Sequence, residues 1–489
     1  MQTHKQADIP QNTEVGYVVS AQDYLVFIEG LPNAKVNDII VTRTGGRALV
    51  SALDHNRVEA QMLDAERPRP GDFFTMSTQG LRLPLSSKLF GRAINPIGLA
   101  LDGKASLPPG GEEIDLEIVA PGIEAREIIT RQFYTGLTTI DTLVPVGQGQ
   151  RELVLGEARA GQNAFYLDII IAQRTYKRIC VYAAIGRPEL EVRRFSEAVN
   201  AAGAGDYTII VAATSNESAP MISICPAVAI SVAEYYQKQG LDVLCILDDL
   251  ATHAKYLREM SLLAGRVPGR ESYPADIFYQ HSHLLERGGN FNKLHGGGSI
   301  TMLPVIETAL ESFSNLIPTN VMSITDGHIM FSAGLFATGT YPAVQVDKSV
   351  TRVGRQTQIF IHKVLSDKVR SLLADYKEME RYASFGSELT PETLQTIKRG
   401  KVLEELLKQS PQTFIPWEAQ IVLLTLVFTG LFDGMEIDAI AAKKKVLIDT
   451  IKTDTMYTKY FTQYKGMKFD ALVESLSKEL SGAKKALGI

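Results

Sequence analysis

The chain has 489 residues, of which 45% are hydrophobic and 21% charged, and its formal net charge is −5. This composition is ordinary for a globular protein with several domains, and the weak negative charge excludes nucleic-acid binding driven by bulk electrostatics. The longest apolar stretch, residues 421–432, is interrupted by threonine and glycine and is too short to span a bilayer. We therefore expect membrane contact only through partner subunits.

The first part of the chain is predicted to form a small β-barrel or sandwich. Residues 1–13 are polar, and we expect them to be disordered or extended. From Glu14 to about Leu81, short runs rich in β-branched residues alternate with turn signals at regular spacing, which is typical of all-β domains. The runs are VGYVVSA, YLVFIEGL, DIIVTR, RALVSAL, RVEAQML and DFFTMS. We assign residues 1–81 to an N-terminal β-barrel domain.

The middle of the chain, residues 82–365, has a different pattern. Apolar runs of strand length alternate with helical stretches, which indicates βαβ units around a parallel sheet. This pattern predicts a doubly wound domain of the nucleotide-binding type. The runs are RELVLG, RICVYAAIG, YTIIVAATS, LDVLCILDDL, GSITMLPVIE and VMSITDGHIMF.

The last part of the chain, residues 366–489, contains no further strand pattern. LQTIKRGKVLEELLKQ and LVESLSKELSGAKKALG both repeat apolar residues near helical spacing. These repeats predict a C-terminal helical bundle.

The stretch GEARAGQN, from Gly156 to Asn163, has the position of a phosphate-binding loop between a strand and a helix. Such loops follow the pattern G-x-x-x-x-G-K-[ST]. Gly156 and Gly161 have the required spacing, but Gln162 and Asn163 replace the lysine and the hydroxyl residue. A plain tight turn is the alternative interpretation of the glycines taken alone.

Two further positions fit a nucleotide site. Asp248 ends the apolar run LDVLCILDD, where nucleotide hydrolases place a carboxylate near magnesium. The alternative is that Asp248 or Asp249 caps the following helix. Arg352, in SVTRVGRQTQ, is suited to reach a phosphate in a neighbouring subunit, whereas an ordinary surface arginine is the alternative.

Taken together, these motifs resemble the alpha subunit of the F-type ATP synthase over nearly the whole chain. The matching strings are GLTTIDTLVPVGQGQREL, EMSLLAGRVPGRESYPADIFYQHSHLLER, GSITMLPVIET, IPTNVMSITDGHI, SVTRVG and SFGSEL. The resemblance implies a multidomain α/β protein with an N-terminal β-barrel, a RecA-like parallel α/β nucleotide domain and a C-terminal helical bundle. It also implies an alternating hexamer with catalytic beta subunits around a gamma-type central shaft.

An alpha-type rather than a beta-type subunit is favoured by the residue that follows Gly186. By resemblance, a catalytic beta subunit carries there a glutamate that orients the attacking water. This chain has Arg187, and Glu189 lies two positions later, beyond a proline. We therefore expect the isolated chain to be inactive and to contribute to an enzyme only within a rotary ATP synthase or ATPase.

The resemblance assigns roles to individual residues. Arg352 is the arginine offered to the neighbouring catalytic site, and Ser323 lines the same face. Gly156, Gly161, Gln162, Asn163 and Gln409 belong to the chain's own nucleotide site, with Asp248 as a magnesium ligand only if Mg-nucleotide binds. ATP or ADP with Mg²⁺ is expected at the beta sites.

The chain's own site is expected to be weak or empty. Glutamine supplies no charge to phosphate, and asparagine supplies no hydroxyl to magnesium. A further departure is that Gln412 is shifted by one position from the adenine-facing glutamines of alpha subunits. The short N-terminal segment also puts docking of a peripheral stalk in doubt.

The expected location is peripheral, on the cytoplasmic side of a bacterial or archaeal membrane, which the chain reaches only through other subunits. The first alternative is an alpha-like subunit of an F-like motor for motility or secretion. The second is an RNA-translocating ring, which requires exposed barrel aromatics and a basic groove. Because the barrel aromatics fall mostly at core-like positions, no nucleic-acid partner is expected.

Overall fold

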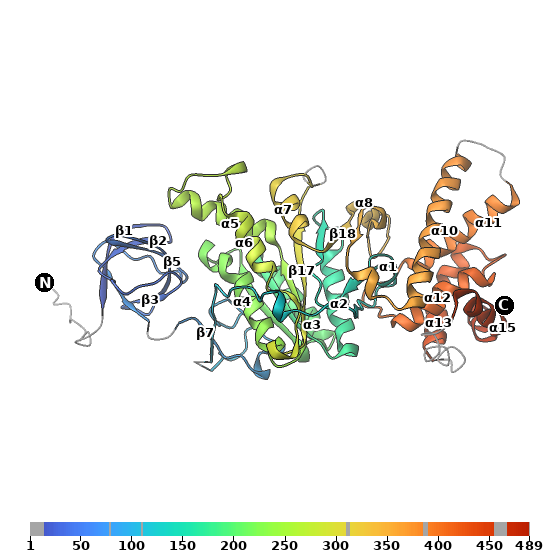
Figure 1. The fold of residues 1–489 in the computed structure, drawn as a ribbon, viewed down its shortest axis with the longest axis horizontal. Helices are drawn as coiled ribbons and strands as arrows, with labels where there is room; N and C mark the ends of the chain where they lie inside the picture. The colour runs from blue at the N-terminus through green and yellow to red at the C-terminus, as the bar shows by residue number, and fades with distance from the viewer. Residues whose placement is uncertain are drawn as a thin grey trace. The chain divides into compact units, whose positions relative to one another are not determined.

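The computed structural model describes residues 14–77, 80–108, 111–309, 313–384, 390–453 and 467–488, and Figure 1 traces its elements. The chain divides into two compact units, each built from several segments. Unit 1 comprises residues 1–126, 178–307 and 311–324, and unit 2 comprises residues 127–177, 308–310 and 325–489. The expectation for residues 1–13, and most of the SFGSEL string, lie outside the described residues.

The N-terminal part of unit 1 is a closed six-stranded barrel, in the order β1-β2-β5-β4-β3-β6. Closure leaves no unpaired strand edge. Alternate side chains, including Val26, Ile28 and Phe74, fill its core. Its strands are β1 (Val15–Gln22), β2 (Leu25–Glu29), β3 (Ile39–Thr42), β4 (Arg47–Asp54), β5 (Arg57–Met62) and β6 (Phe73–Met76). The predicted barrel is confirmed.

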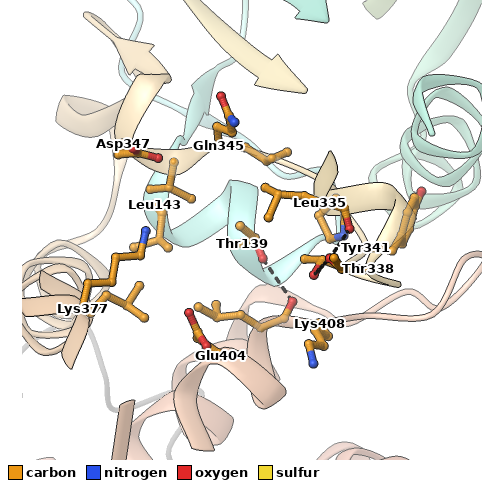
Figure 2. Close-up of a pocket in the computed structure, with 16 residues that line it drawn as sticks. Thr139, Leu143, Leu335, Thr338, Tyr341, Gln345, Asp347, Lys377, Glu404 and Lys408 are labelled. Atoms are coloured by element: carbon orange, nitrogen blue, oxygen red, sulfur yellow. Dashed lines mark hydrogen bonds between the residues drawn. The ribbon is translucent and has the colours of Figure 1, made fainter. Parts of the chain in front are cut away.

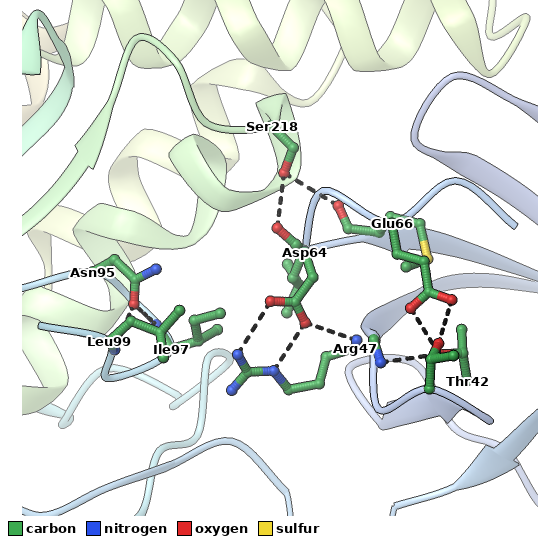
Figure 3. A network of polar contacts seen from close by, with 12 residues as sticks. Thr42, Arg47, Asp64, Glu66, Asn95, Ile97, Leu99 and Ser218 are labelled. Carbon is green, nitrogen blue, oxygen red and sulfur yellow. Dashed lines mark hydrogen bonds and ion pairs between the residues drawn. The ribbon is translucent and has the colours of Figure 1, made fainter. Parts of the chain in front are cut away.

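Polar contacts join the barrel to the rest of unit 1 (Figure 3). Arg47 holds Asp64 through its backbone N–H at 2.8 Å and its Nε at 3.0 Å. The Ser218 hydroxyl, at the start of helix α4 (Ala219–Gln237), lies 3.2 Å from the carbonyl oxygens of Met62 and Leu63. The barrel is therefore anchored through the residues that follow β5.

Three parallel strands of unit 1, β13 (Ile179–Arg187), β15 (Asp242–Asp248) and β17 (Ser299–Glu307), have charged residues at their carboxyl ends. β15 lies between β13 and β17, and β14 (Thr208–Thr214) pairs with β13 on its other side. The strands are almost wholly buried, as expected for a parallel sheet covered by helices. The helices are α3 (Glu189–Ala201), α4, α5 (Leu250–Leu263), α6 (Ile277–Leu285) and α7 (Leu316–Ile324).

Among the described residues, α4 is the one helix long and apolar enough to cross a membrane, but 89% of its apolar window is buried. It packs against β13 and β15. A core helix passes the same length and hydropathy test, so α4 is accounted for by the sheet that it covers.

Unit 2 carries the parallel pair β12 (Leu153–Gly156) and β18 (Gly327–Phe331), with β19 (Val350–Thr351) antiparallel to β18. The helices beside these strands are α1 (Thr138–Leu143), α2 (Gln162–Tyr176), α8 (Ala333–Ala337) and α9 (Gly354–Thr357). The C-terminal helices are α10 (Phe360–Ser384), α11 (Pro391–Leu407), α12 (Trp417–Thr425), α13 (Ile437–Thr453), α15 (Phe469–Lys478) and α16 (Ser481–Leu487). The predicted helical bundle is confirmed.

The remaining elements are short. The strand pieces are β7 (Arg82–Leu83), β8 (Ala93–Ile94), β9 (Glu112–Glu113), β10 (Gln132–Phe133), β11 (Val146–Gly147) and β16 (Gly289–Asn290). The 3₁₀ turns are Ser87–Leu89, Ile123–Ala125, Gly205–Tyr207, Arg270–Ser272, Lys293–His295, Val346–Lys348 and Leu426–Thr429. β8 extends the sheet of unit 1 beside β14.

Two element predictions were partly wrong. The run VMSITDGHIMF begins in helix α7, and its strand starts only at Gly327, because Ile317 and Val321 are buried at helical spacing. The last helical stretch divides into α15 and α16, since Glu479 leaves helical geometry (φ −117°, ψ 41°). The domain boundaries at residues 81 and 365 stay predictions.

Candidate functional site

The loop between β12 and α2 has the backbone of a phosphate-binding loop. Gly161 adopts a left-handed conformation (φ 89°) at the start of α2, which favours glycine. A Cβ on Gly161 would lie 2.8 Å from the Phe336 ring, so the tight approach also requires glycine. This geometry makes Gly161 the turn residue at the start of α2, while the roles of Gly156 and Gly161 toward a nucleotide stay predictions.

The Gln162 side chain folds back into the loop instead of pointing outward. It is 3% exposed; its Nε2 donates to the Glu157 carbonyl at 2.8 Å, and its Oε1 accepts from the Ala160 N–H at 3.1 Å. Backbone N–H groups in such loops normally bind phosphate oxygens. Here an amide oxygen from the chain itself accepts from one of them.

Other side chains complete this internal closure. The Glu157 carboxylate accepts from the Ala333 N–H at 3.0 Å, which ties the loop to α8. Phe336, from the same helix, lies against Gly161. Asn163 is exposed and replaces the hydroxyl that would otherwise ligate magnesium. The Ala160 N–H and the Glu157 carboxylate of the loop are thus satisfied within unit 2, and Phe336 lies against Gly161.

Helix α2 carries a buried carboxylate, Asp168, that was not predicted from the sequence. Asp168 accepts from the Tyr341 hydroxyl at 2.5 Å and from the Gln412 backbone N–H at 2.6 Å. Burial raises the pKa of Asp168, and these two donors oppose the shift. Because its partners are far away in sequence, no local pattern could have identified this group.

Gln409 was predicted to belong to the nucleotide site, and its side chain is engaged within unit 2. Its Oε1 accepts from the Thr138 N–H at 3.1 Å, and its Nε2 donates to the Gly136 carbonyl at 2.7 Å. The residue is only 4% exposed. These contacts give Gln409 a structural role, while its role toward adenine stays a prediction.

Asp248, in unit 1, is buried and bound by a cation. Arg187 donates to both carboxylate oxygens, through Nη2 to Oδ1 and through Nε to Oδ2 at 3.1 Å. The Tyr182 hydroxyl donates to Oδ2 at 2.6 Å. The remaining guanidinium nitrogen of Arg187 binds Glu307 at 3.0 Å. Burial raises the pKa of Asp248, and Arg187 opposes that shift.

The next residue, Asp249, caps helix α5 by accepting from the Thr252 N–H at 2.5 Å. The capping alternative is therefore confirmed for Asp249 and does not apply to Asp248. Burial raises the pKa of Asp249 to about 6. The described residues contain no group of three or more His, Cys, Asp or Glu side chains able to hold a metal ion.

A magnesium ion does not fit the residues at Asp248 as they are arranged. Both of its carboxylate oxygens already accept from a guanidinium, and a second cation there would face Arg187. The assignment of Asp248 as a magnesium ligand, which is conditional on nucleotide binding, stays a prediction that this arrangement opposes.

Arg352, in unit 2, contrasts with the residues of the loop. It is exposed, and its backbone N–H donates to the Asp326 carbonyl at 3.0 Å. The Asp326 carboxylate is held by Arg151 at 2.9 Å, and the Arg352 side chain makes no hydrogen bond or ion pair with another described residue. Its guanidinium is therefore available to a partner.

A buried glutamate is influenced by Arg352. Burial and the charge of Asp326 raise the pKa of Glu152 well above its ordinary value, while the positive charge of Arg352 lowers it. Glu152 is fully buried and receives a hydrogen bond from Gln150 at 2.5 Å.

Ser323 is exposed near the end of α7, and its hydroxyl donates to the Asn320 carbonyl at 2.7 Å. It belongs to unit 1, whereas Arg352 belongs to unit 2. The expectation that the two residues line one face stays a prediction.

Unit 2 also contains a cavity of about 560 Å³ that the sequence analysis did not identify. Figure 2 shows Lys377, Glu404, Asp347 and Lys408 around it. The volume suits a small molecule. Its charged groups are of both signs, and Lys408 already pairs with Glu405 at 2.9 Å, so the lining selects no ligand class.

Comparison with known protein families decides the relationship of the chain. Residues 136–351 match the nucleotide-binding domain of the ATP synthase alpha/beta family, and residues 358–482 match the C-terminal domain of the ATP synthase alpha/beta chain. The chain is 39% identical over 448 residues to ATP synthase subunit alpha of Neorickettsia sennetsu, covering 90% of this chain and 88% of that protein.

The chain belongs to the ATP synthase subunit alpha family. The match to the alpha subunit of Orientia tsutsugamushi is 34% over 489 residues and covers 97% of this chain and 95% of that protein. The match to the alpha subunit of Anaplasma phagocytophilum is 35% over 450 residues, covering 90% and 89%. Membership of the alpha family agrees with the barrel, the parallel strands and the C-terminal helices described above.

Proposed function

We propose that this chain is a non-catalytic alpha-type subunit of a rotary F-type ATP synthase or ATPase, whose own nucleotide site is weakened or lost. In this role it alternates with beta-type catalytic subunits around a gamma-type shaft. ATP or ADP with Mg²⁺ binds at the beta sites, and the complex is peripheral to the membrane. Peripheral-stalk docking concerns residues outside those described.

The observation that carries the proposal is the position of the Gln162 side chain. It is buried inside the loop and bonded to Glu157 and Ala160. Loss of a charge-assisted contact to phosphate costs about 1.5–3 kcal/mol. Breaking the loop's internal bonds adds to that cost, so nucleotide binding at this loop is disfavoured twice.

The absence of a catalytic base supports a non-catalytic role. Arg187 follows Gly186, where a carboxylate would be needed to orient water. It is engaged with Asp248 and Glu307. Glu189 is exposed in the first turn of α3. Arg187 is a cation and cannot act as a base.

The free guanidinium of Arg352 supports the second half of the proposal. Phosphoryl transfer accumulates negative charge that a neighbouring arginine stabilises, and arginine is always charged and presents a planar fork of donors. Arg352 is exposed, and the Asp326 carboxylate is held by Arg151, so among the described residues the Arg352 guanidinium forms no ion pair. Ser323 is proposed to line the same face.

A second candidate function is an alpha-like subunit of an F-like motor for motility or secretion. The loss of the loop lysine favours a divergent paralogue but does not distinguish the two candidates. Co-purification separates them: a synthase brings membrane rotor subunits with it, and a motor of the second kind does not. In the RNA-translocating ring, the barrel aromatics would be exposed; Tyr24 and Phe74 are buried, whereas Tyr17 is 55% exposed and Phe27 and Phe73 are partly buried.

The proposal is tested by separating the chain from its partner. The purified full chain is expected to hydrolyse no ATP alone, and activity is expected when a beta-type partner is added. The matched control is the beta-type partner alone. Robust turnover by the pure chain would contradict the non-catalytic assignment, and a mixture no more active than the beta control would contradict the assembly.

A further inference from the structure

Three neighbouring parallel strands of unit 1 bring opposite charges together at their carboxyl ends. β15 pairs with β13 on one side and with β17 on the other. β13 ends at Arg187, β15 at Asp248 and β17 at Glu307. The carboxyl ends of such strands are where open α/β sheets bind ligands and ions.

Arg187 bridges two carboxylates that come from different strands. Two of its nitrogens bind Asp248, and Nη1 binds Glu307 at 3.0 Å. The side chains are 15%, 1% and 22% exposed for Arg187, Asp248 and Glu307. Without the guanidinium, two carboxylates would face each other in a poorly solvated place, which is strongly unfavourable.

Another arginine of unit 1, Arg287, shows an ordinary structural ion pair. Arg287 is fully buried and binds both oxygens of a single carboxylate, Glu234, at 2.7 and 2.9 Å, as well as the Ser231 hydroxyl. One cation balances one carboxylate there. Arg187 instead holds two carboxylates together, which is the arrangement of a bridging divalent cation with oxygen ligands.

We infer that Arg187 takes the place of a divalent cation at the Asp248–Glu307 pair and so closes this carboxylate site to Mg²⁺. The inference deepens the proposed loss of the chain's nucleotide site, and it rests on that proposed function for the expectation that Asp248 is a magnesium position. Gln162 and Asn163 replace the side chains that would bind the phosphate and the magnesium ion. Arg187 occupies the carboxylates of Asp248 and Glu307 that would otherwise bind the metal.

The inference is tested by Mn²⁺ binding to the full chain, followed by electron paramagnetic resonance without nucleotide or partner subunits. The wild-type chain and Asp248→Asn should bind Mn²⁺ equally. Arg187→Gln should gain one saturable Mn²⁺ per chain, at least about tenfold tighter than residual surface binding. That ion should be lost again in Arg187→Gln/Glu307→Gln.

Arg287→Gln is the matched control, because it breaks a buried ion pair that contains one carboxylate. It should gain no Mn²⁺. Arg187→Lys keeps a cation at the site and should also gain none. If Arg187→Gln fails to fold, Arg187→Gln/Glu307→Gln relieves the carboxylate repulsion and should fold, which would itself support the bridging role.

Two results would overturn the inference. One is a Mn²⁺ ion in the wild-type chain that Asp248→Asn removes. The other is a folded Arg187→Gln chain with no additional Mn²⁺. Neither result would bear on the proposal that Arg352 acts at the catalytic site of a neighbouring subunit, because the measurement involves neither nucleotide nor partner.

Discussion

The loop at residues 156–163 and the segment at residues 350–354 differ in the burial and hydrogen bonding of one polar side chain each. In the loop, Gln162 is buried and bonded to the backbone of its own turn. In the segment, Arg352 is exposed and makes no bond through its side chain to a described residue. Both regions belong to unit 2. One folded unit therefore contains a loop closed by its own side chain and an arginine that is open to a partner.

Under the proposed function, this difference means that nucleotide binding and the supply of an arginine to a neighbour are lost separately. A loop that binds phosphate must leave its N–H groups unsatisfied until the ligand arrives. A loop with an internal acceptor is stable without ligand. In the proposed role, Arg352 must stay unpaired within its own chain, and the Asp326 carboxylate is already held by Arg151.

Replacing Arg352 is expected to have the largest effect and could break the comparison. Arg352→Ala should reduce ATP turnover of the assembled complex by roughly 10³–10⁵-fold, because the transferred phosphoryl group loses a cation. Nucleotide binding to the beta sites and ring assembly should persist. Steady-state kinetics and size-exclusion chromatography of the complex measure these quantities.

The control is Arg355→Ala, which removes an exposed arginine of the adjoining helix α9 that pairs with Asp367 at 2.6 Å. Its turnover should stay near the wild-type rate. If Arg352→Ala and Arg355→Ala behave alike, Arg352 is an ordinary surface arginine, and the open half of the comparison fails.

Restoring the loop residues should have the next largest effect. Gln162→Lys with Asn163→Thr should raise nucleotide affinity of the chain about tenfold to a hundredfold, since one charge-assisted contact is worth about 1.5–3 kcal/mol. Titration with a fluorescent ATP analogue measures the affinity. If Arg187 replaces the metal, Mg²⁺ should add little to this gain until Arg187→Gln is also introduced.

Ala158→Lys is the matched control, because it adds the same charge at an exposed position of the same loop. It should raise affinity much less than the double variant. Equal gains would mean that charge alone matters, and no gain in either variant would mean that the loop is closed for reasons other than Gln162 and Asn163.

A smaller effect is expected from the buried carboxylate near Arg352. The folded-state pKa of Glu152 is raised above its ordinary value of 4.5. Its contribution to stability is therefore fully present below the unfolded pKa and is lost as the pH rises through the folded pKa. In Glu152→Gln the side chain is uncharged at every pH. Between about pH 5 and pH 8, the free energy of unfolding of this variant should therefore fall less than that of the wild type.

The size of this effect is about 1.4 kcal/mol for each unit by which the pKa is raised. Urea unfolding at the two pH values measures it. Because Arg352 lowers the pKa of Glu152, Arg352→Ala should steepen the same dependence. If the free energy of unfolding depends on pH in the same way in the wild type and Glu152→Gln, Glu152 does not titrate in this range. The predicted electrostatic link between Glu152 and Arg352 would then be wrong.

Much of the fold could be predicted from the sequence because periodicity is local. The six barrel runs and the buried parallel strands appear in the structure, since alternation and apolar runs report burial directly. The run around Val321 was wrongly predicted to be a strand from its start, because short apolar stretches occur in helices and strands alike. Its helix is decided by burial of Ile317 and Val321 on one face.

The candidate site was less predictable, because side-chain direction is set by partners far away in the sequence. The glycines of the loop were recognised from spacing, but nothing local shows that Gln162 turns inward. At position 187, the sequence showed only that an arginine replaces the glutamate of a catalytic subunit. The bond of Arg187 to Asp248, 61 residues later, depends on strand order. Asp168 and Tyr341 meet across 173 residues.

The most direct test of the closed loop is the location and number of nucleotides in the purified complex. We predict no more than one nucleotide per beta-type subunit, and none at residues 156–163 of this chain, when the complex is examined at high resolution and its nucleotide is quantified after denaturation. Mg-ATP bound at the Gln162 loop, with a nucleotide count above one per beta-type subunit, would contradict the account.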